Sequence, residues 1–265
     1  MIYYDYHMHS NFSADSQTPM EDMIKKSIEL GLKEICFTDH VDYDILENPN
    51  VKIDYNKYFE DLNFYKNKYK NKITIKKGIE MGLQTQVLDR CSNEIKENDF
   101  DFVIGSIHTI DRYELCKGGF HKGKTQHETY EGYYKRLLEI INLYDDYSIL
   151  GHVDLIKRYG NYDTILKDEL FFDYLEAILK KVIHSGKGIE INTSSFRYNL
   201  PDLTPSKNII KMYKDLGGEI LTIGSDSHNP TQIANKFNYI HDVLGSMGYK
   251  YICKFNKMKP EFIKI

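Results

Sequence analysis

The sequence contains no tryptophan, only four cysteines and no apolar run long enough to cross a membrane. A membrane-spanning helix needs about 18 or more consecutive apolar residues, and the N-terminus also lacks the pattern of a secretory signal. No Cys-x-x-Cys pair is present, which argues against a thiolate zinc site and against a disulfide framework. The cysteines are Cys36, Cys91, Cys116 and Cys253. We therefore expect a soluble, cytoplasmic protein with free thiols.

A surplus of positive charge is absent as well. The chain has 35 Lys and Arg against 39 Asp and Glu, a net charge of −4, which excludes a generally basic nucleic-acid binder. Its 265 residues are 41% hydrophobic, enough for a sizeable core. Because no internal repeat, low-complexity linker or charge run divides the chain, we expect a single domain over residues 1–265.

Seven short apolar segments alternate with helical patterns, and this alternation predicts an α/β fold with a parallel sheet. The expected strands are 3–7, 34–38, 73–80, 100–107, 148–151, 188–192 and 219–224, with a short final strand at 249–255. The expected helices are 18–31, 55–69, 84–97, 126–144, 167–185, a segment starting at 204, and 229–244. An open sheet would separate its first and last strands by steps of about 4.8 Å. Ligand-type residues on both of those strands therefore favour a closed barrel, in which all strand C-termini share one rim.

Three connecting segments carry expectations of their own. Thr18, Pro19 and Glu21 predict a helix start with a capping box. Residues 41–54 read as a long acidic loop. Residues 109–124 contain two adjacent glycines and show no clear period, so we expect a flexible lid there.

Histidines gather at the ends of the expected strands. His7 and His9 lie two residues apart, so an extended strand directs both side chains to the same face. Of the ten histidines, six fall at or just past strand ends: His7, His9, His40, His108, His152 and His228. Glu80, Asn192 and Asp226 occupy equivalent positions. In a barrel, these side chains would converge on one rim.

Imidazole and carboxylate ligands without thiolates suit zinc, iron or manganese. The number of such groups exceeds what one ion needs, so we expect two or three ions. Glu80 is placed to bridge two of them. Bridged ions lower the pKa of a shared water and offset the charge of a transferring phosphoryl group. This chemistry suits hydrolysis of a phosphate ester.

The order and spacing of these motifs resemble the PHP family (polymerase and histidinol phosphatase), and the similarity runs from residue 7 to residue 228. Length and loop content are similar to those of its stand-alone histidinol-phosphatase branch. The motifs are His7-x-His9, Asp15, Thr38-Asp39-His40, Gly78-Ile79-Glu80, Ser106-Ile107-His108, Gly151-His152-x-Asp154, Glu190-x-Asn192 and Gly224-Ser225-Asp226-x-His228.

The resemblance implies a distorted (β/α)7 barrel with a trinuclear metal centre at the C-terminal rim of the strands. It implies that one ion is held by His7, His9, Glu80 and Asp226, a second by Glu80, His108 and His152, and a third by Asp15, His40 and His228. The implied activity is hydrolysis of L-histidinol phosphate to L-histidinol and phosphate in histidine biosynthesis, by in-line attack of a metal-bound hydroxide.

Catalytic and substrate-binding roles fall on residues within or beside these motifs. Asp42 and His108 are the candidate catalytic residues, with Asp42 as the acid that protonates the leaving alcohol. Arg197 could clamp phosphate with two parallel hydrogen bonds, and Arg158 and Asn192 are further candidates for substrate binding. The acidic residues Asp42, Asp44 and Glu47 could receive the cationic groups of histidinol phosphate.

Two other functions remain open at this point. One is a phosphoesterase of the same family that acts on another small phosphate or on nucleotides. The other is a non-catalytic, metal-stabilised accessory domain. A nuclease would need a basic track for the nucleic-acid backbone, and the loops contain none. We therefore expect a small phosphorylated substrate, with no nucleic acid or membrane as partner.

Overall fold

Seven parallel strands form a nearly closed barrel in the computed structural model, which describes residues 2–46 and 50–265. Neighbouring strands follow the chain order β1-β2-β5-β6-β9-β10-β11. Their bounds are β1 Tyr4–Met8, β2 Glu34–Phe37, β5 Thr74–Gly82, β6 Phe102–Ser106, β9 Ile149–Leu150, β10 Gly188–Asn192 and β11 Leu221–Gly224. The alternation read from the sequence is confirmed, and each predicted strand overlaps an observed one.

The barrel closes between its first strand and the segment after its last one. Met8 and Ser227 form a parallel bridge, the Asp226 amide donates to the His7 carbonyl at 2.8 Å, and the His9 amide donates to the Ser227 carbonyl at 2.8 Å. These contacts place His7 and His9 beside Asp226. The closure expected from ligand-type residues on the first and last strands is therefore present.

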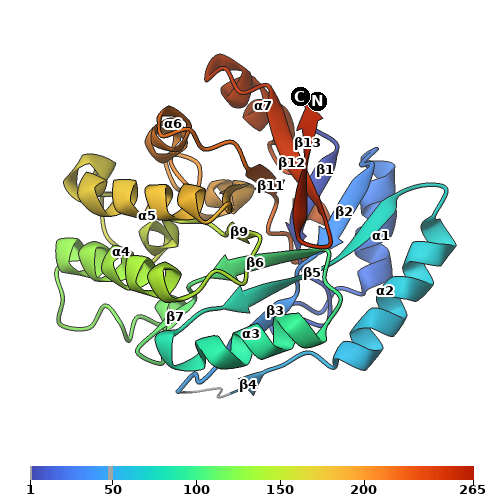
Figure 1. The fold of residues 1–265 in the computed structure, drawn as a ribbon, viewed down its shortest axis with the longest axis horizontal. Helices are drawn as coiled ribbons and strands as arrows, with labels where there is room; N and C mark the ends of the chain where they lie inside the picture. Colours follow the sequence, from blue (N-terminus) through green and yellow to red (C-terminus); the bar gives the residue numbers. More distant parts are fainter. Residues whose placement is uncertain (1, 47–49) are drawn as a thin grey trace.

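In the described part of the chain, seven α-helices surround the strands, one after each barrel strand (Figure 1). They are α1 Met20–Glu29, α2 Tyr55–Tyr69, α3 Leu88–Glu97, α4 Gln126–Leu143, α5 Phe172–His184, α6 Lys207–Asp215 and α7 Phe237–Ser246. The predicted start of α1 is wrong in one respect, because no side chain caps this helix. Thr18 Oγ1 donates instead to the His228 carbonyl at 2.9 Å, and so ties the loop after β1 to the loop after β11.

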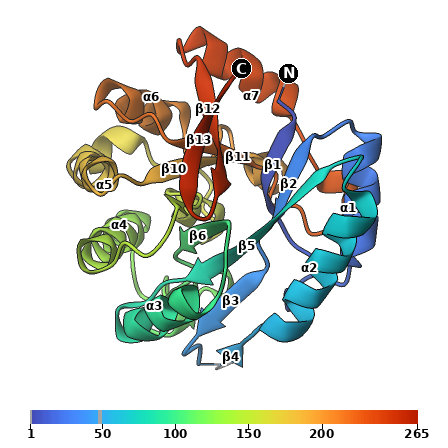
Figure 2. The same cartoon turned by 45° about the vertical axis from the view of Figure 1, so that its right-hand side comes forward.

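A C-terminal hairpin closes the end of the barrel opposite the strand C-termini. It consists of β12 Tyr251–Asn256 and β13 Lys259–Lys264, which pair antiparallel. Figure 2 shows it lying across the middle of the ring of helices. Phe255 and Cys253 form a buried apolar cluster with residues from inside the barrel strands, among them Tyr6 and Phe102. The sequence predicted β12 but gave no sign of β13 or of the plug that the two strands form.

Both irregular segments have more structure than the sequence predicted. The expected acidic loop contains β3 His40–Tyr43, which pairs with β5, and β4 Asn50–Val51; Glu47 lies outside the described residues. The expected lid contains the short hairpin of β7 Thr109–Ile110 and β8 Tyr113–Glu114. Leu115 and Phe120 are buried in the hydrophobic core, while residues 111–113, 116–117 and 122–124 are exposed.

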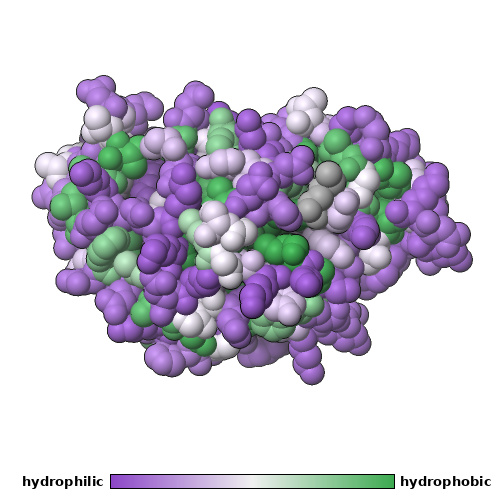
Figure 3. Space-filling model, turned by 90° about the horizontal axis from the view of Figure 1, so that it is seen from above, coloured by the Kyte–Doolittle hydropathy of each residue, from purple (hydrophilic) through white to green (hydrophobic). Residues whose placement is uncertain are grey.

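The surface is mostly hydrophilic on the face seen in Figure 3, where apolar residues occur in small, separate groups. Among the described residues, no helix is both long enough and apolar enough to cross a membrane.

Candidate metal centre

Five imidazoles surround the carboxylate of Glu80 at the C-terminal rim. Oε1 lies 3.1 Å from His108 Nε2 and 2.9 Å from His152 Nε2. Oε2 lies 3.0 Å from His7 Nε2, 3.1 Å from His40 Nδ1 and 3.6 Å from His9 Nε2. Glu80 is fully buried near the end of β5, and Ser106 Oγ donates to its Oε1 at 2.6 Å. One carboxylate therefore faces ligand atoms from several strands.

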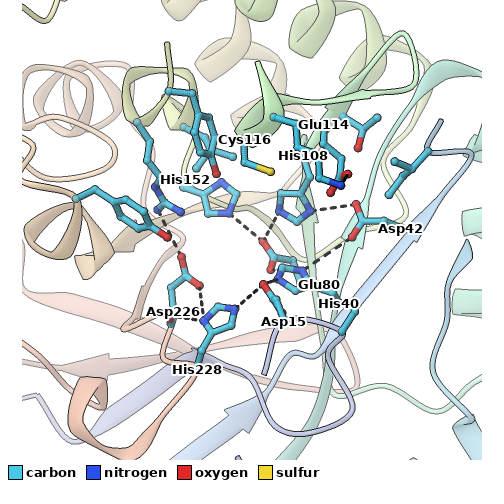
Figure 4. A pocket seen from close by; sticks show the side chains of 18 of the residues that line it. Asp15, His40, Asp42, Glu80, His108, Glu114, Cys116, His152, Asp226 and His228 are labelled. Atoms are coloured by element: carbon cyan, nitrogen blue, oxygen red, sulfur yellow. Dashed lines mark hydrogen bonds and ion pairs between the residues drawn. The ribbon is translucent and has the colours of Figure 1, made fainter. Parts of the chain in front are cut away.

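The side chains that the sequence grouped together also lie together. His9 Nε2 lies 3.4 Å from Asp226 Oδ1, beside His7 and Glu80. Asp15 Oδ2 lies 3.5 Å from His40 Nε2 and 3.1 Å from His228 Nε2 (Figure 4). Four overlapping groups have ligand atoms within 4.8 Å of one another: His9-His40-His228, His7-His9-Asp226, His7-Glu80-His152 and His40-Glu80-His108.

Several imidazoles contact a further protein group through the ring nitrogen that points away from the centre. His7 Nδ1 lies 2.6 Å from Glu190 Oε1, and His9 Nδ1 lies 3.0 Å from Ser13 Oγ. His108 Nδ1 lies 3.1 Å from Asp42 Oδ1, and His228 Nδ1 lies 3.1 Å from the Asp226 carbonyl. Metal-ligating histidines typically use one nitrogen for the ion and the other for such a partner. The arrangement fixes the free nitrogen toward the centre.

The donor set fits divalent ions such as zinc, iron or manganese. His9 Nε2 and His40 Nδ1 are buried and have no hydrogen-bond partner in the described part of the chain, although both face Glu80. Buried polar atoms in proteins are normally satisfied, and a metal ion would satisfy these two. Imidazole and carboxylate ligands without thiolate match the same ions.

The charges of the centre reinforce one another. Burial alone would lower the pKa of His7, but the carboxylates of Glu190 and Glu80 raise it well above its usual value. Burial likewise lowers the pKa of His40, and Glu80 and Asp15 raise it to about 9. Burial would raise the pKa of Glu80, but the imidazoles of His7 and His108 hold it well below its usual value. His7 and His40 therefore favour their charged forms beside the Glu80 carboxylate, whereas burial and the neighbouring His228 and His40 lower the pKa of His9 well below its usual value.

Metal binding should therefore release protons at neutral pH. Without metal, the raised pKa values of His7 and His40 mean that both imidazoles bind a proton more tightly in the folded than in the unfolded chain. These protons contribute their full stabilisation below pH 6.5, the ordinary pKa of histidine, and the contribution of His40 is lost as pH rises through about 9. Ions must displace these protons, so we expect metal affinity to rise over the same pH range. Calorimetric titration with zinc at pH 7, in two buffers of different ionisation enthalpy, measures the release. Identical heats in both buffers would contradict this expectation.

Backbone geometry at the end of β11 also serves the centre. Asp226 has a left-handed φ of 52°, a conformation that is uncommon outside glycine and is enriched at functional sites. A Cβ at Gly224 would lie 2.2 Å from Glu190 Oε1 and 2.3 Å from His7 Cβ. Only glycine therefore allows β11 to approach the pair formed by His7 and Glu190 this closely.

A cavity of about 560 Å³ opens beside the centre. Asp42, Arg158 and Arg197 line it, together with most of the candidate ligands. Arg158 is held by Ser194 Oγ, and its Nη2 lies 3.5 Å from Asp226 Oδ2. Arg197 donates to the carbonyls of Ser225 at 2.7 Å and Asp226 at 2.5 Å, so part of its guanidinium already supports the loop after β11.

Asn192 lies beneath the cavity and is not among the residues that line it. Its Nδ2 donates to Glu190 Oε2 at 3.1 Å and to Asp226 Oδ2 at 3.3 Å, and its Oδ1 accepts from the Ser194 amide at 2.9 Å. All of these partners belong to the protein. These contacts show that Asn192 holds Glu190 and Asp226 in place, and its predicted substrate contact stays a prediction.

The acidic side chains differ from the expected set as well. Asp44 Oδ1 pairs with Arg112 Nε at 2.9 Å, and Asp44 does not line the cavity. Glu114, from β8, does line it (Figure 4). Sequence reasoning missed Glu114, because it lies in a segment without periodicity, and it also missed the supporting roles of Glu190 and Ser13.

A family model described as "PHP domain" matches residues 5–194, which contain most of the candidate ligands. The chain belongs to the PHP domain family. The resemblance inferred from the motifs is thereby confirmed, and so is the barrel fold that it implies. The predicted ligands Asp226 and His228 follow the matched region, and the structure brings them back to the same rim through closure of the barrel.

Several relatives match nearly the whole chain. A histidinol-phosphatase from Lactococcus lactis subsp. lactis is 32% identical over 261 residues and covers 96% of this chain and 95% of its own. A probable histidinol-phosphatase from Clostridium acetobutylicum is 31% identical, with 88% and 89% covered. The crystal structure of histidinol phosphate phosphatase from Lactococcus lactis subsp. lactis Il1403, complexed with Zn, L-histidinol and phosphate, matches with a TM-score of 0.91, 30% identity and 98% of both chains covered.

Proposed function

We infer that this protein is a metal-dependent phosphatase that hydrolyses L-histidinol phosphate to L-histidinol and phosphate. The observation that carries this conclusion is the carboxylate of Glu80 surrounded by five imidazoles beside an open cavity. The relative from Lactococcus lactis whose structure holds Zn, L-histidinol and phosphate supports the choice of substrate, since it matches along the full barrel.

The proposed ligands of the ions follow the contacts at the rim. One set comprises His7, His9, Glu80 and Asp226, a second Glu80, His108 and His152, and a third Asp15, His40 and His228. Divalent ions in such sets acidify water and offset the charge of a phosphoryl group. Glu190, Ser13 and Asp42 orient the imidazoles of His7, His9 and His108 from behind.

The two arginines supply positive charge to the phosphate from the side of β9 and β10. Arg158 has a 7% exposed side chain, stacks at 4.2 Å over the ring of Tyr198 and faces the cavity. Its planar donors suit a phosphate oxygen pair. Arg197 presents the same kind of group while its two carbonyl contacts hold it in place.

Carboxylates on the opposite wall fit the rest of the substrate. Asp42 lies at the cavity with Oδ1 beside His108, where a carboxyl group can give a proton to the departing alcohol. Glu114 is the other carboxylate of the described lining that stands outside the three ligand sets. Its Oε2 pairs with Lys117 Nζ at 2.6 Å, but unlike Asp44 it lines the cavity. We propose that Glu114, in place of Asp44, receives the ammonium or imidazole of the substrate.

A panel of phosphate esters tests this function. The zinc- or manganese-loaded protein should hydrolyse L-histidinol phosphate with a kcat/KM well above that for glycerol phosphate, sugar phosphates and nucleoside monophosphates. The test also separates the other phosphoesterase functions, because a preference for a nucleotide or a sugar phosphate would replace the substrate assigned here. No hydrolysis of any ester by the loaded protein would leave only a structural role.

Replacing Asp42 tests the proposed acid. For Asp42→Asn, we expect kcat on L-histidinol phosphate to fall by about 10²- to 10⁴-fold, the usual contribution of general acid catalysis. The loss should be much smaller with p-nitrophenyl phosphate, because that leaving group needs no proton. Asp44→Asn is a matched control, since Asp44 pairs with Arg112 away from the cavity. An equal loss on both esters would show that Asp42 acts otherwise, for example by holding His108.

A further inference from the structure

A buried ionic cluster lies directly behind the cavity wall that carries Arg158. Lys157 Nζ lies 2.7 Å from Asp154 Oδ2 and 2.5 Å from Asp168 Oδ1. All three residues are buried: Lys157 is 9% exposed, Asp168 6% and Asp154 0%. One ammonium thus pairs with two carboxylates in the interior, outside the three ligand sets.

Ser206 joins the cluster to the start of α6. Its amide donates to Asp154 Oδ2 at 3.0 Å, and its hydroxyl donates to Asp168 Oδ2 at 2.6 Å. The same hydroxyl accepts from the Ile209 amide at 3.3 Å, as the N-cap of α6. The cluster therefore connects three separate segments: the turn after β9, the segment before α5 and the first turn of α6.

Lys157 and Arg158 are consecutive residues of one short 3-10 helix, Leu155–Arg158, and their side chains diverge. Arg158 lines the cavity beside Asp226. Lys157 does not line it, and its ammonium is held on the other side by the two aspartates. Fixing Lys157 therefore fixes the backbone from which Arg158 projects. His152, a proposed metal ligand, begins the same turn, since its carbonyl accepts from the Leu155 amide at 2.8 Å.

Stability alone is a weak reason for such a cluster, because an apolar replacement of a buried ion pair is often neutral or stabilising. A fixed geometry is a better reason, since a small misplacement of a group that orients substrate can cost a large factor in rate.

We propose that Lys157 is a positioning residue for phosphate recognition: its contacts with Asp154 and Asp168 hold the Leu155–Arg158 turn so that the Arg158 guanidinium meets the phosphate group. This proposal rests on the proposed function of the site, in which Arg158 binds the phosphate. Lys157 does not line the cavity, so its proposed effect passes through Arg158. An effect through His152, which begins the same turn, would show as a loss of metal.

A double-mutant cycle tests this proposal in the metal-loaded protein. The variants are Lys157→Met, Arg158→Met and the double variant, with Lys167→Met as the matched control, because Lys167 is exposed and adjoins Asp168. The measured quantities are kcat and KM for L-histidinol phosphate, the Kd of inorganic phosphate by calorimetry, and metal content. Arg158→Met should weaken phosphate binding by about 10- to 100-fold, as expected for loss of a charged hydrogen bond.

Lys157→Met should raise KM and the Kd of phosphate by about tenfold, with a smaller change in kcat and full metal content. In the Arg158→Met background the same substitution should change them by less than about twofold, because coupled residues are not additive. Lys167→Met should change neither quantity. An equal loss in both backgrounds, or none in the wild-type background, overturns the positioning role.

The same variants also distinguish two further outcomes. If Arg158→Met leaves phosphate binding unchanged, the role of Arg158 in the proposed function fails, and the positioning proposal falls with it. If Lys157→Met does not fold, Asp168→Asn replaces it, because that variant keeps the pair between Lys157 and Asp154 and releases only one contact of the ammonium. A smaller rise in KM that disappears in the Arg158→Met background supports the proposal, and a rise that persists there overturns it.

Discussion

Glu80→Gln should abolish phosphate-ester hydrolysis while the barrel stays folded. Replacing a residue that only supports a metal ligand typically lowers metal affinity or activity by about 10- to 100-fold. Glu80 is itself a proposed ligand, so we expect kcat/KM to fall by at least about 10³-fold. The reason is the position of its two oxygens, which face His108 and His152 on one side and His7, His40 and His9 on the other. An amide keeps the shape but replaces one acceptor with a donor and removes the charge.

Steady-state kinetics, metal content and circular dichroism together check this expectation. Glu34→Gln is a matched control: Glu34 is also a buried strand glutamate, but it accepts from Tyr6 at the opposite end of the barrel. Its activity should stay within about twofold of the wild type, as expected for a site remote from the chemistry. Unchanged turnover in Glu80→Gln at full metal content would refute the bridging role.

Removing the metal should eliminate activity and lower thermal stability together. An ion present at about 1,000 times its Kd stabilises the folded state by about 4 kcal/mol, and for a chain of this size each kcal/mol shifts Tm by about 2–4 °C. We therefore expect a chelated protein to melt at least about 8 °C below the loaded one. The physical source is the set of buried imidazoles and carboxylates that ions draw together.

Calorimetric melting with elemental analysis of the same samples measures this effect. Adding zinc or manganese to the chelated protein should restore both Tm and turnover. Magnesium should restore much less of either, because it prefers oxygen ligands and the centre is rich in imidazole. Full turnover by a sample with far less than one ion per chain would contradict a metal-dependent mechanism.

The parts of the site that the sequence predicted are those with a local signature. His7 and His9 follow a strand pattern at a spacing of two, and His108 and His152 each end an apolar run. Because a barrel collects strand ends on one rim, their convergence followed from topology, and the structure places all nine proposed ligands there. The family match and the barrel confirm the predicted family and fold, on which this convergence depends.

The features that escaped prediction depend on tertiary contacts. Thr18 has the residue type of a helix cap, yet its hydroxyl donates to the His228 carbonyl, more than 200 positions away. Glu190 supports His7, and Lys157 pairs with Asp168, only because separate strands and turns meet. The sequence grouped Asp44 with the substrate contacts, but Asp44 does not line the cavity and pairs with Arg112 outside it. Glu114 gave no signal because the short hairpin that carries it lacks a periodic pattern.

The hairpin of β12 and β13 determines which end of the barrel substrate and products can use. Phe255 and Cys253 fill the floor of the barrel together with Tyr6 and Phe102, so substrate entry and product exit share the mouth at the rim. The Arg158 side chain is 7% exposed and that of Glu114 is 23% exposed, so in the proposed function phosphate would lie deeper than the alcohol. We expect ordered release, with L-histidinol departing before inorganic phosphate, and phosphate acting as a competitive inhibitor.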